Sequence, residues 1–165
     1  MNCIILIGYR GVGKSTIAKA VAAKLECKQI SLDTLLSEKI GNLQAFIKEN
    51  GWEKFREEES ELIEHLAYSN TVIDCGGGVV ESEKNMNYLS ALGTIFYLRA
   101  SSQVIKERLI TTNPRLSLSG TTVFNEIDEV LARRDPLYRK YADYVIDTTI
   151  LSPDDSCEKI MSLYL

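Results

Sequence analysis

Histidine is almost absent from this chain of 165 residues, which contains only one, His65. A site that needs several imidazoles, for a metal or for a proton relay, is therefore excluded, and His65 is expected to be a structural residue in the middle of a helix. The four cysteines form no C-x-x-C pair, so neither a zinc site nor a thioredoxin-like redox motif is indicated. We expect no secretory signal, and we expect reduced thiols in a cytoplasmic protein.

The sequence also lacks long apolar runs and an excess of positive charge. The apolar run Cys3–Ile7 is far too short to cross a membrane. With 19 Lys and Arg against 23 Asp and Glu, the net charge is −4, which does not provide the positive field that drives non-specific nucleic-acid binding. We therefore expect neither a membrane nor a nucleic acid as partner. The length predicts a single domain over residues 1–165, and we expect it to be a monomer.

Short apolar runs alternate with longer helical patterns along the chain. Cys3–Ile7 is typical of a strand that is buried on both faces of a parallel sheet, and residues 14–25 repeat apolar side chains at helical spacing. The other predicted strands are Gln29–Leu32, Thr71–Asp74, Thr94–Leu98 and Tyr144–Ile146. Five strands joined by helical crossovers predict an α/β fold, a three-layer sandwich with a central five-stranded parallel sheet.

The first of two glycine clusters fits a phosphate-binding loop. Residues 8–15, Gly-Tyr-Arg-Gly-Val-Gly-Lys-Ser, match G-x-x-x-x-G-K-[ST] at every fixed position, between a predicted strand and a predicted helix. Backbone N–H groups of such a loop cradle phosphates, and the helix N-terminus adds its positive dipole end. Lys14 is predicted to reach the β- and γ-phosphates of ATP, and the Ser15 hydroxyl to bind Mg²⁺. The predicted ATP-binding residues in this loop are Gly11, Val12, Gly13, Lys14, Ser15 and Thr16.

Later motifs follow the loop in a recognisable order. They are an aspartate after the second predicted strand, Phe55-Arg56, Gly76-Gly77-Gly78 and Arg134-Asp135-Pro136-Leu137-Tyr138. Together with the loop they resemble the shikimate kinase family over nearly the whole chain. The resemblance implies a P-loop fold of the nucleoside-monophosphate-kinase type, and transfer of the γ-phosphate of ATP to the 3-hydroxyl of shikimate in aromatic amino-acid biosynthesis. It also implies a substrate-binding region at about 33–60 and a lid at about 111–122.

The resemblance places two arginines and two glycines at the substrate, which is a small cyclic carboxylic acid. Arg56 and Arg134 occupy the family's arginine positions, and a guanidinium group can hold a carboxylate with two parallel hydrogen bonds. Gly77 and Gly78 would let backbone N–H groups approach the substrate. Arg133 is the alternative to Arg134, which is preferred for its spacing to the following proline. For Arg56 the alternative is a solvated helix charge paired with a neighbouring glutamate.

The segment after the second predicted strand departs from the family pattern, which usually has Asp-x-Asp there. When the positions are counted back from Gly41, Asp33 falls on the second aspartate, which faces the substrate hydroxyls, and Ser31 falls on the first, which lies near magnesium. We therefore assign Asp33 to the substrate, where its carboxylate would orient or deprotonate the attacking oxygen.

Serine at position 31 leaves magnesium short of a carboxylate, because Mg²⁺ is usually held by one or two carboxylates together with phosphate oxygens and waters. Asp74 ends an apolar strand in the Walker-B arrangement and is the candidate replacement. The predicted metal residues are thus Ser15 and Asp74, the latter acting through water. An aspartate that only stabilises the turn before the glycines is the alternative.

The polar stretch Thr111–Thr122 is predicted to form a mobile lid. Its single cation, Arg115, resembles the family's lid arginine and would bring positive charge to the transferring phosphoryl group. The predicted catalytic residues are therefore Lys14, Asp33 and Arg115. Arg108 resembles a family arginine that stacks on adenine, so Arg108 and Arg115 join the predicted ATP-binding residues.

Two other functions share part of this pattern. A gluconate kinase has a P-loop and a similar length, but the triple glycine and the Arg-x-Pro-Leu-Tyr motif favour shikimate. A nucleotide-binding regulatory module that has lost catalysis is an alternative from a different class. The presence of Lys14, Ser15, Asp33 and Arg115 argues against that alternative.

Overall fold

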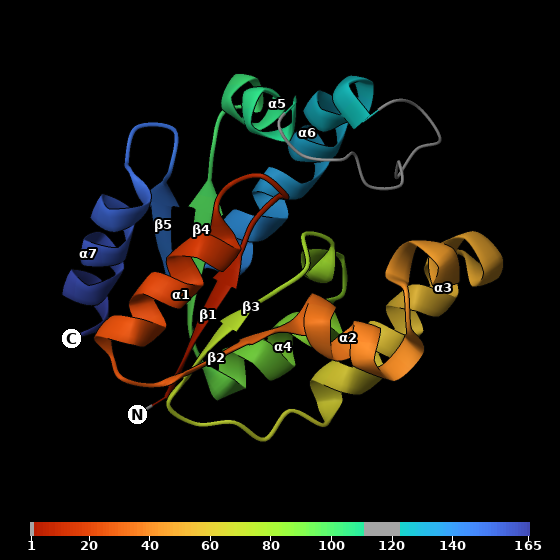
Figure 1. The fold of residues 1–165 in the computed structure, drawn as a ribbon, viewed down its shortest axis with the longest axis horizontal. Helices are drawn as coiled ribbons and strands as arrows, with labels where there is room; N and C mark the ends of the chain where they lie inside the picture. The colour runs from red at the N-terminus through yellow and green to blue at the C-terminus, as the bar shows by residue number, and fades with distance from the viewer. Residues whose placement is uncertain (1, 111–122) are drawn as a thin grey trace.

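The strands of the computed structural model, which describes residues 2–110 and 123–165, form one parallel sheet (Figure 1). They are β1 (Cys3–Ile7), β2 (Lys28–Ser31), β3 (Thr71–Asp74), β4 (Gly93–Arg99) and β5 (Tyr144–Asp147). Their order across the sheet is β2-β3-β1-β4-β5, and every neighbouring pair is parallel. The predicted five-stranded parallel sheet is confirmed.

Helices cover both faces of this sheet. They are α1 (Lys14–Lys24), α2 (Leu32–Ile40), α3 (Leu43–Glu64), α4 (Glu83–Leu92), α5 (Ser102–Ile110), α6 (Val123–Tyr141) and α7 (Pro153–Tyr164), with a 3₁₀ turn over Val79–Glu81. The α1 and α7 helices pack side by side on one face, and α4 lies on the other (Figure 1). This arrangement confirms the three-layer sandwich. Within residues 2–110 and 123–165, none of the helices has the length and apolarity needed to cross a membrane.

Several predicted strand boundaries differ from the observed ones by one residue, and His65 lies elsewhere than predicted. The end of the second strand and the place of His65 each have a local reason. The second strand ends at Ser31 rather than Leu32, because the Ser31 hydroxyl accepts a hydrogen bond from the Thr34 backbone N–H at 3.4 Å and so caps α2. His65 does not lie in the middle of a helix. It ends α3, where it is exposed and its Nδ1 lies 2.8 Å from the carbonyl oxygen of Glu61.

The central strand, β1, is buried on both faces, which explains its uninterrupted apolar sequence. Ile4 and Leu6 pack on the side of α1, against Ile17, whereas Ile5 and Ile7 pack on the side of α4. Because β1 lies between β3 and β4, the loop after β1 and the segment after β3 leave the same edge of the sheet next to each other.

The α2 and α3 helices extend beyond the carboxyl edge of the sheet (Figure 1). They form a small apolar cluster of their own, in which Leu36, Ile47 and Phe55 are buried and Trp52 packs against them. The α3 helix bends at Gly51, whose φ of 85° is in the left-handed region. The bend divides α3 into one helical stretch before Gly51 and another after it.

Gly93, at the start of β4, lies so close to β1 that replacing it with alanine is expected to destabilise the protein. A Cβ on Gly93 would lie 1.9 Å from the carbonyl oxygen of Cys3, its partner on β1. Because the obstructing atoms belong to the backbone, β1 and β4 would have to separate. We expect Gly93→Ala to lower the free energy of unfolding by about 1–3 kcal/mol, measured by urea denaturation. Ser90→Ala, at an exposed position on α4, is the control, and equal stability of the two variants would contradict this account.

Candidate active site

The loop between β1 and α1 is arched around its own lysine. The Lys14 ammonium group donates hydrogen bonds to the carbonyl oxygens of Gly8, at 2.9 Å, and Tyr9, at 3.0 Å. Gly8 and Gly13, the two fixed glycines of the motif, have φ angles of 144° and 99°, a backbone conformation that favours glycine. The fixed positions of the motif therefore correspond to real backbone requirements, and the cation is held within the loop at the N-terminus of α1.

The two predicted metal residues lie in direct contact. The Ser15 hydroxyl donates a hydrogen bond of 2.5 Å to Oδ2 of Asp74, which ends β3 and is 5% exposed. A hydroxyl and a carboxylate are the hard oxygen groups that Mg²⁺ prefers, so this pair fits a magnesium site. The described residues contain no cluster of three or more His, Cys, Asp or Glu side chains that could hold a metal. A magnesium ion here would therefore take most of its ligands from phosphate oxygens and water.

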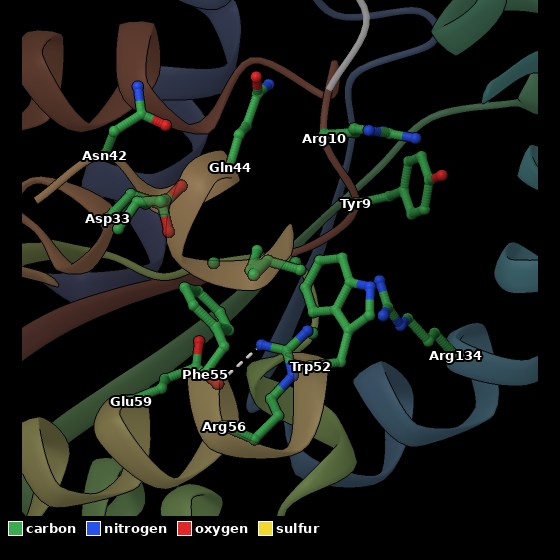
Figure 2. Close-up of a pocket in the computed structure, with 15 residues that line it drawn as sticks. Tyr9, Arg10, Asp33, Asn42, Gln44, Trp52, Phe55, Arg56, Glu59 and Arg134 are labelled. Carbon is green, nitrogen blue, oxygen red and sulfur yellow. Dashed lines mark hydrogen bonds and ion pairs between the residues drawn. The ribbon is translucent and has the colours of Figure 1, made fainter. Parts of the chain in front are cut away.

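A cavity of about 320 Å³ opens beside the loop, between α2, α3 and α6 (Figure 2). This volume is in the range of small-molecule sites. Its polar lining includes Tyr9, Arg10, Asp33, Asn42, Gln44, Arg56, Glu59 and Arg134, with Gly76, Gly77 and Gly78 at its base. All five predicted substrate-binding residues, which are Asp33, Arg56, Gly77, Gly78 and Arg134, line this one cavity although they are far apart in the sequence.

Arg56 is held in the cavity by a buried carboxylate and two aromatic rings. Its Nη1 lies 2.8 Å from Oε2 of Glu59, which is 1% exposed (Figure 2). The guanidinium carbon lies 5.3 Å from the ring centres of both Trp52 and Phe55. Burial raises the pKa of the Glu59 carboxyl, and the charge of Arg56 opposes that shift. Arg56 is thus a positioned cation in the cavity wall rather than a solvated helix charge.

Arg134 is held by a second carboxylate, that of Glu81 in the 3₁₀ turn after the glycines. Its Nε and Nη2 each lie 3.2 Å from a different oxygen of Glu81, and Arg134 is 3% exposed. Arg133 reaches the same carboxylate from outside, with its side chain 55% exposed. Although burial acts to raise the pKa of Glu81, the two guanidinium groups hold it below its usual value. The structure therefore places Arg134, and not Arg133, in the cavity wall.

Two carboxylate oxygens meet over the first glycine of the triplet. A Cβ on Gly76 would lie 3.1 Å from Oδ1 of Asp33 and 3.2 Å from Oε1 of Glu59. That Glu59 oxygen is buried and has no hydrogen-bond partner among the residues that the structure describes. One part of the cavity thus offers acceptors for hydroxyl groups, while Arg56 and Arg134 offer donors for an anion. This combination fits a ligand with both hydroxyls and a carboxylate.

Sequence reasoning missed several residues of the cavity. Tyr9 and Arg10 occupy variable positions of the P-loop motif, which place no constraint on the side chain, yet both line the cavity. Arg10 forms an ion pair of 2.8 Å with Glu126 of α6, a carboxylate that is fully buried. Glu59 was hidden in a run of three glutamates, and only its spacing of three residues from Arg56 on a helix could have indicated the pairing.

Arg108 braces the phosphate-binding loop from the side of α5. It donates hydrogen bonds to the carbonyl oxygens of Gly11, at 3.2 Å, and Thr148, at 2.7 Å. The Thr148 hydroxyl in turn donates to the carbonyl oxygen of Val12 at 2.9 Å. Stacking of Arg108 on adenine stays a prediction. Arg115 lies outside the described residues, and its role at the phosphoryl group stays a prediction as well.

Comparisons with known proteins agree with this site. A family model described as shikimate kinase matches residues 10–164. The shikimate kinase of Thermodesulfovibrio yellowstonii is 39% identical over 166 residues, which cover 99% of this chain and 95% of that relative.

Solved structures agree in fold as well as in sequence. The shikimate kinase of Acinetobacter baumannii, solved in complex with shikimate, matches with a TM-score of 0.89 and 25% identity, over 99% of this chain and 92% of that chain. The shikimate kinase of Bacteroides thetaiotaomicron matches with a TM-score of 0.87 and 28% identity, over 98% of this chain and 97% of that chain. The family model and the relative both extend over nearly all of the sequence, and the P-loop from Arg10 onward and the arginines of the cavity lie within the residues that the family model matches. The chain belongs to the shikimate kinase family.

Proposed function

We propose that this chain transfers the γ-phosphate of ATP to the 3-hydroxyl of shikimate, with Mg²⁺ as cofactor, as a cytoplasmic monomer in aromatic amino-acid biosynthesis. The observation that carries the proposal is a cavity next to the P-loop that is lined by Asp33, Arg56 and Arg134 together. Membership of the family and the shikimate-bound structure of a relative support the choice of acceptor.

The acceptor carboxylate is assigned to the two arginines. A guanidinium group carries five N–H donors, so pairing with a glutamate leaves others available to a ligand. Glu59 and Glu81 hold Arg56 and Arg134 at 2.8 Å and 3.2 Å, which fixes the two cations before the acceptor arrives. Fixed cations lose little side-chain freedom on binding, and an uncharged analogue would leave both arginines without their ligand.

The acceptor hydroxyls are assigned to Asp33. This residue lies in the first turn of α2, where backbone N–H groups stabilise a negative charge. Its Oδ1 lies close to Gly76, the first of the three glycines that follow β3 and line the cavity. From this position the carboxylate accepts a hydrogen bond from the attacking hydroxyl and can take its proton as the new P–O bond forms.

The nucleotide phosphates are assigned to the loop of residues 8–15. In this proposal Lys14 and the backbone N–H groups of Gly11, Val12 and Gly13 would bind the phosphates, and the N-terminus of α1 would add its dipole. The Ser15–Asp74 pair would hold Mg²⁺, which when bound neutralises charge on the β- and γ-phosphates. The main tasks of the protein in this reaction are to position the two substrates and to supply positive charge.

The proposal is tested by ADP release with ATP and a panel of acceptors. We expect shikimate to stimulate release strongly, and gluconate and nucleoside monophosphates to have little effect. Stimulation by gluconate alone would favour a sugar-acid kinase. Binding of ATP without stimulation by any acceptor would favour the regulatory module and would contradict the proposal.

The third glycine provides a selective test of the acceptor site. A Cβ on Gly78 would lie 1.9 Å from Nη2 of Arg56, the end of a flexible side chain that can move away. We therefore expect Gly78→Ala to fold normally, to raise the KM for shikimate by about tenfold or more, and to leave the KM for ATP unchanged.

Ser90→Ala, at an exposed position on α4 that does not line the cavity, is the control for this substitution. Steady-state kinetics with each substrate varied in turn measure the difference. An equal KM for shikimate in Gly78→Ala and the native chain would show that the position of Arg56 does not matter for the acceptor.

A further inference from the structure

We infer that Asp74 on β3 carries the carboxylate directed at magnesium, and that the facing residue on β2, Ser31, carries none. This inference rests on the proposed use of ATP with Mg²⁺. It goes further by assigning the metal-directed charge to one strand and by predicting that the charge can be moved to the neighbouring strand.

The contact between Ser15 and Asp74 fixes the orientation of the hydroxyl. The Ser15 hydroxyl gives its single proton to Oδ2 of Asp74 at 2.5 Å, which leaves the lone pairs of its oxygen available to a cation. Asp74 is 5% exposed whereas Ser15 is exposed, so the carboxylate lies behind the hydroxyl and the Ser15 oxygen is accessible to a cation. The carboxylate therefore both orients the Ser15 oxygen and places a negative charge next to the loop that binds phosphate.

The sheet register places Ser31 directly beside Asp74. These two residues are partners in the pairing of β2 with β3, and on the other side Asp74 is the partner of Leu6 on β1. Leu6 packs with Ile17 on the face that α1 covers, and side chains alternate between faces along a strand. Ser31 and Asp74 therefore share the face of the sheet from which α1 presents Ser15.

Asp33 lies in a different environment from Asp74. Asp33 lines the acceptor cavity, whereas Asp74 is not part of that lining and contacts the first turn of α1 instead. Ser31 uses its hydroxyl to cap α2 through the Thr34 N–H. The two carboxylates thus have different roles: Asp33 is directed to the acceptor and Asp74 to the metal of the nucleotide.

The test measures metal-dependent nucleotide binding rather than turnover. ADP affinity is determined by calorimetry with excess Mg²⁺ and with EDTA, for the full chain and for Asp74→Asn. We expect Mg²⁺ to tighten ADP binding to the native chain. In Asp74→Asn the gain in ADP affinity that Mg²⁺ provides is expected to be about 10- to 100-fold smaller. The ADP affinity of this variant in EDTA is expected to be no weaker than that of the native chain. Asp154→Asn, at an exposed position on α7, removes the same charge as a control.

A second variant keeps the test valid if Asp74→Asn does not fold. The exchanged chain, Ser31→Asp with Asp74→Ser, moves the carboxylate to the facing strand, where aspartate still caps α2. We expect it to recover most of the Mg²⁺ effect that Asp74→Ser alone loses. A full Mg²⁺ effect in Asp74→Asn, or failure of the exchanged chain to recover it, would overturn the inference. Because ADP binding requires no acceptor, these outcomes are independent of whether shikimate is the substrate.

Discussion

Replacing Lys14 with methionine is expected to lower kcat by about a thousandfold, the scale on which a cation acts on a transferring phosphoryl group. The Lys14 ammonium group lies within the arch of the loop, 2.9 Å from the carbonyl oxygen of Gly8 and 3.0 Å from that of Tyr9. Methionine keeps much of the length and removes the charge. The transition state then loses a positive partner, and the two carbonyl oxygens lose the donor that draws them together.

Lys19→Met is the matched control for this prediction, because Lys19 lies on the same helix and is exposed. Turnover is measured at saturating ATP and acceptor, and thermal denaturation reports whether the loop change affects the fold. Turnover of Lys14→Met within a few-fold of the control would contradict the assignment of the loop.

Replacing Asp33 with asparagine is expected to lower kcat by about 10²- to 10⁴-fold, the range for loss of a general base. Asparagine preserves the shape of the side chain and can still hydrogen-bond the acceptor hydroxyl, but it cannot take the proton. We therefore expect the KM for shikimate to change far less than kcat. This separation distinguishes a reacting carboxylate from one that only binds.

The control for Asp33→Asn is Glu38→Gln, an exposed position further along α2. Both substitutions neutralise one acid on the same helix, so a general effect of charge or helix stability would affect them equally. If Asp33→Asn raised the KM for shikimate and left kcat at the level of the control, Asp33 would be a binding residue without a role in proton transfer.

The three arginines that line the cavity are compatible with a net charge of −4 because each of them is paired with an acid. Arg56 has Glu59, Arg134 has Glu81, and Arg10 has Glu126. Breaking such a pair at a buried position is costly, so the acids hold the guanidinium groups in place. An acidic chain can therefore present a local positive site to a carboxylate and a phosphate.

Much of the fold could be predicted from the sequence because its signals are local. The apolar run Cys3–Ile7 and the P-loop motif predict a buried strand, a glycine turn and a helix, and these form as expected. The boundary at Ser31 was missed because serine both extends a strand and caps a helix, and only the contact with Thr34 decides between them.

The lining of the cavity could be predicted less completely. The lining residues that belong to no motif come together only when distant segments of the chain pack against one another. Glu81 follows the glycine triplet with no motif of its own, and its role depends on α6 bringing Arg134 within 3.2 Å. Tyr9 and Arg10 are variable positions in a motif that specifies only the phosphate side of the loop. Such contacts are properties of the assembled fold, and a single sequence carries no periodic signal for them.

The most direct test of the proposed reaction identifies its product. The chain is incubated with ATP, Mg²⁺ and shikimate, and ³¹P and ¹H NMR spectra are recorded as the reaction proceeds. We predict one new phosphomonoester for each ADP formed, with its phosphorus coupled to the hydrogen on carbon 3 of shikimate. Release of inorganic phosphate alone, or a phosphate on a different hydroxyl, would contradict the account of a shikimate 3-kinase.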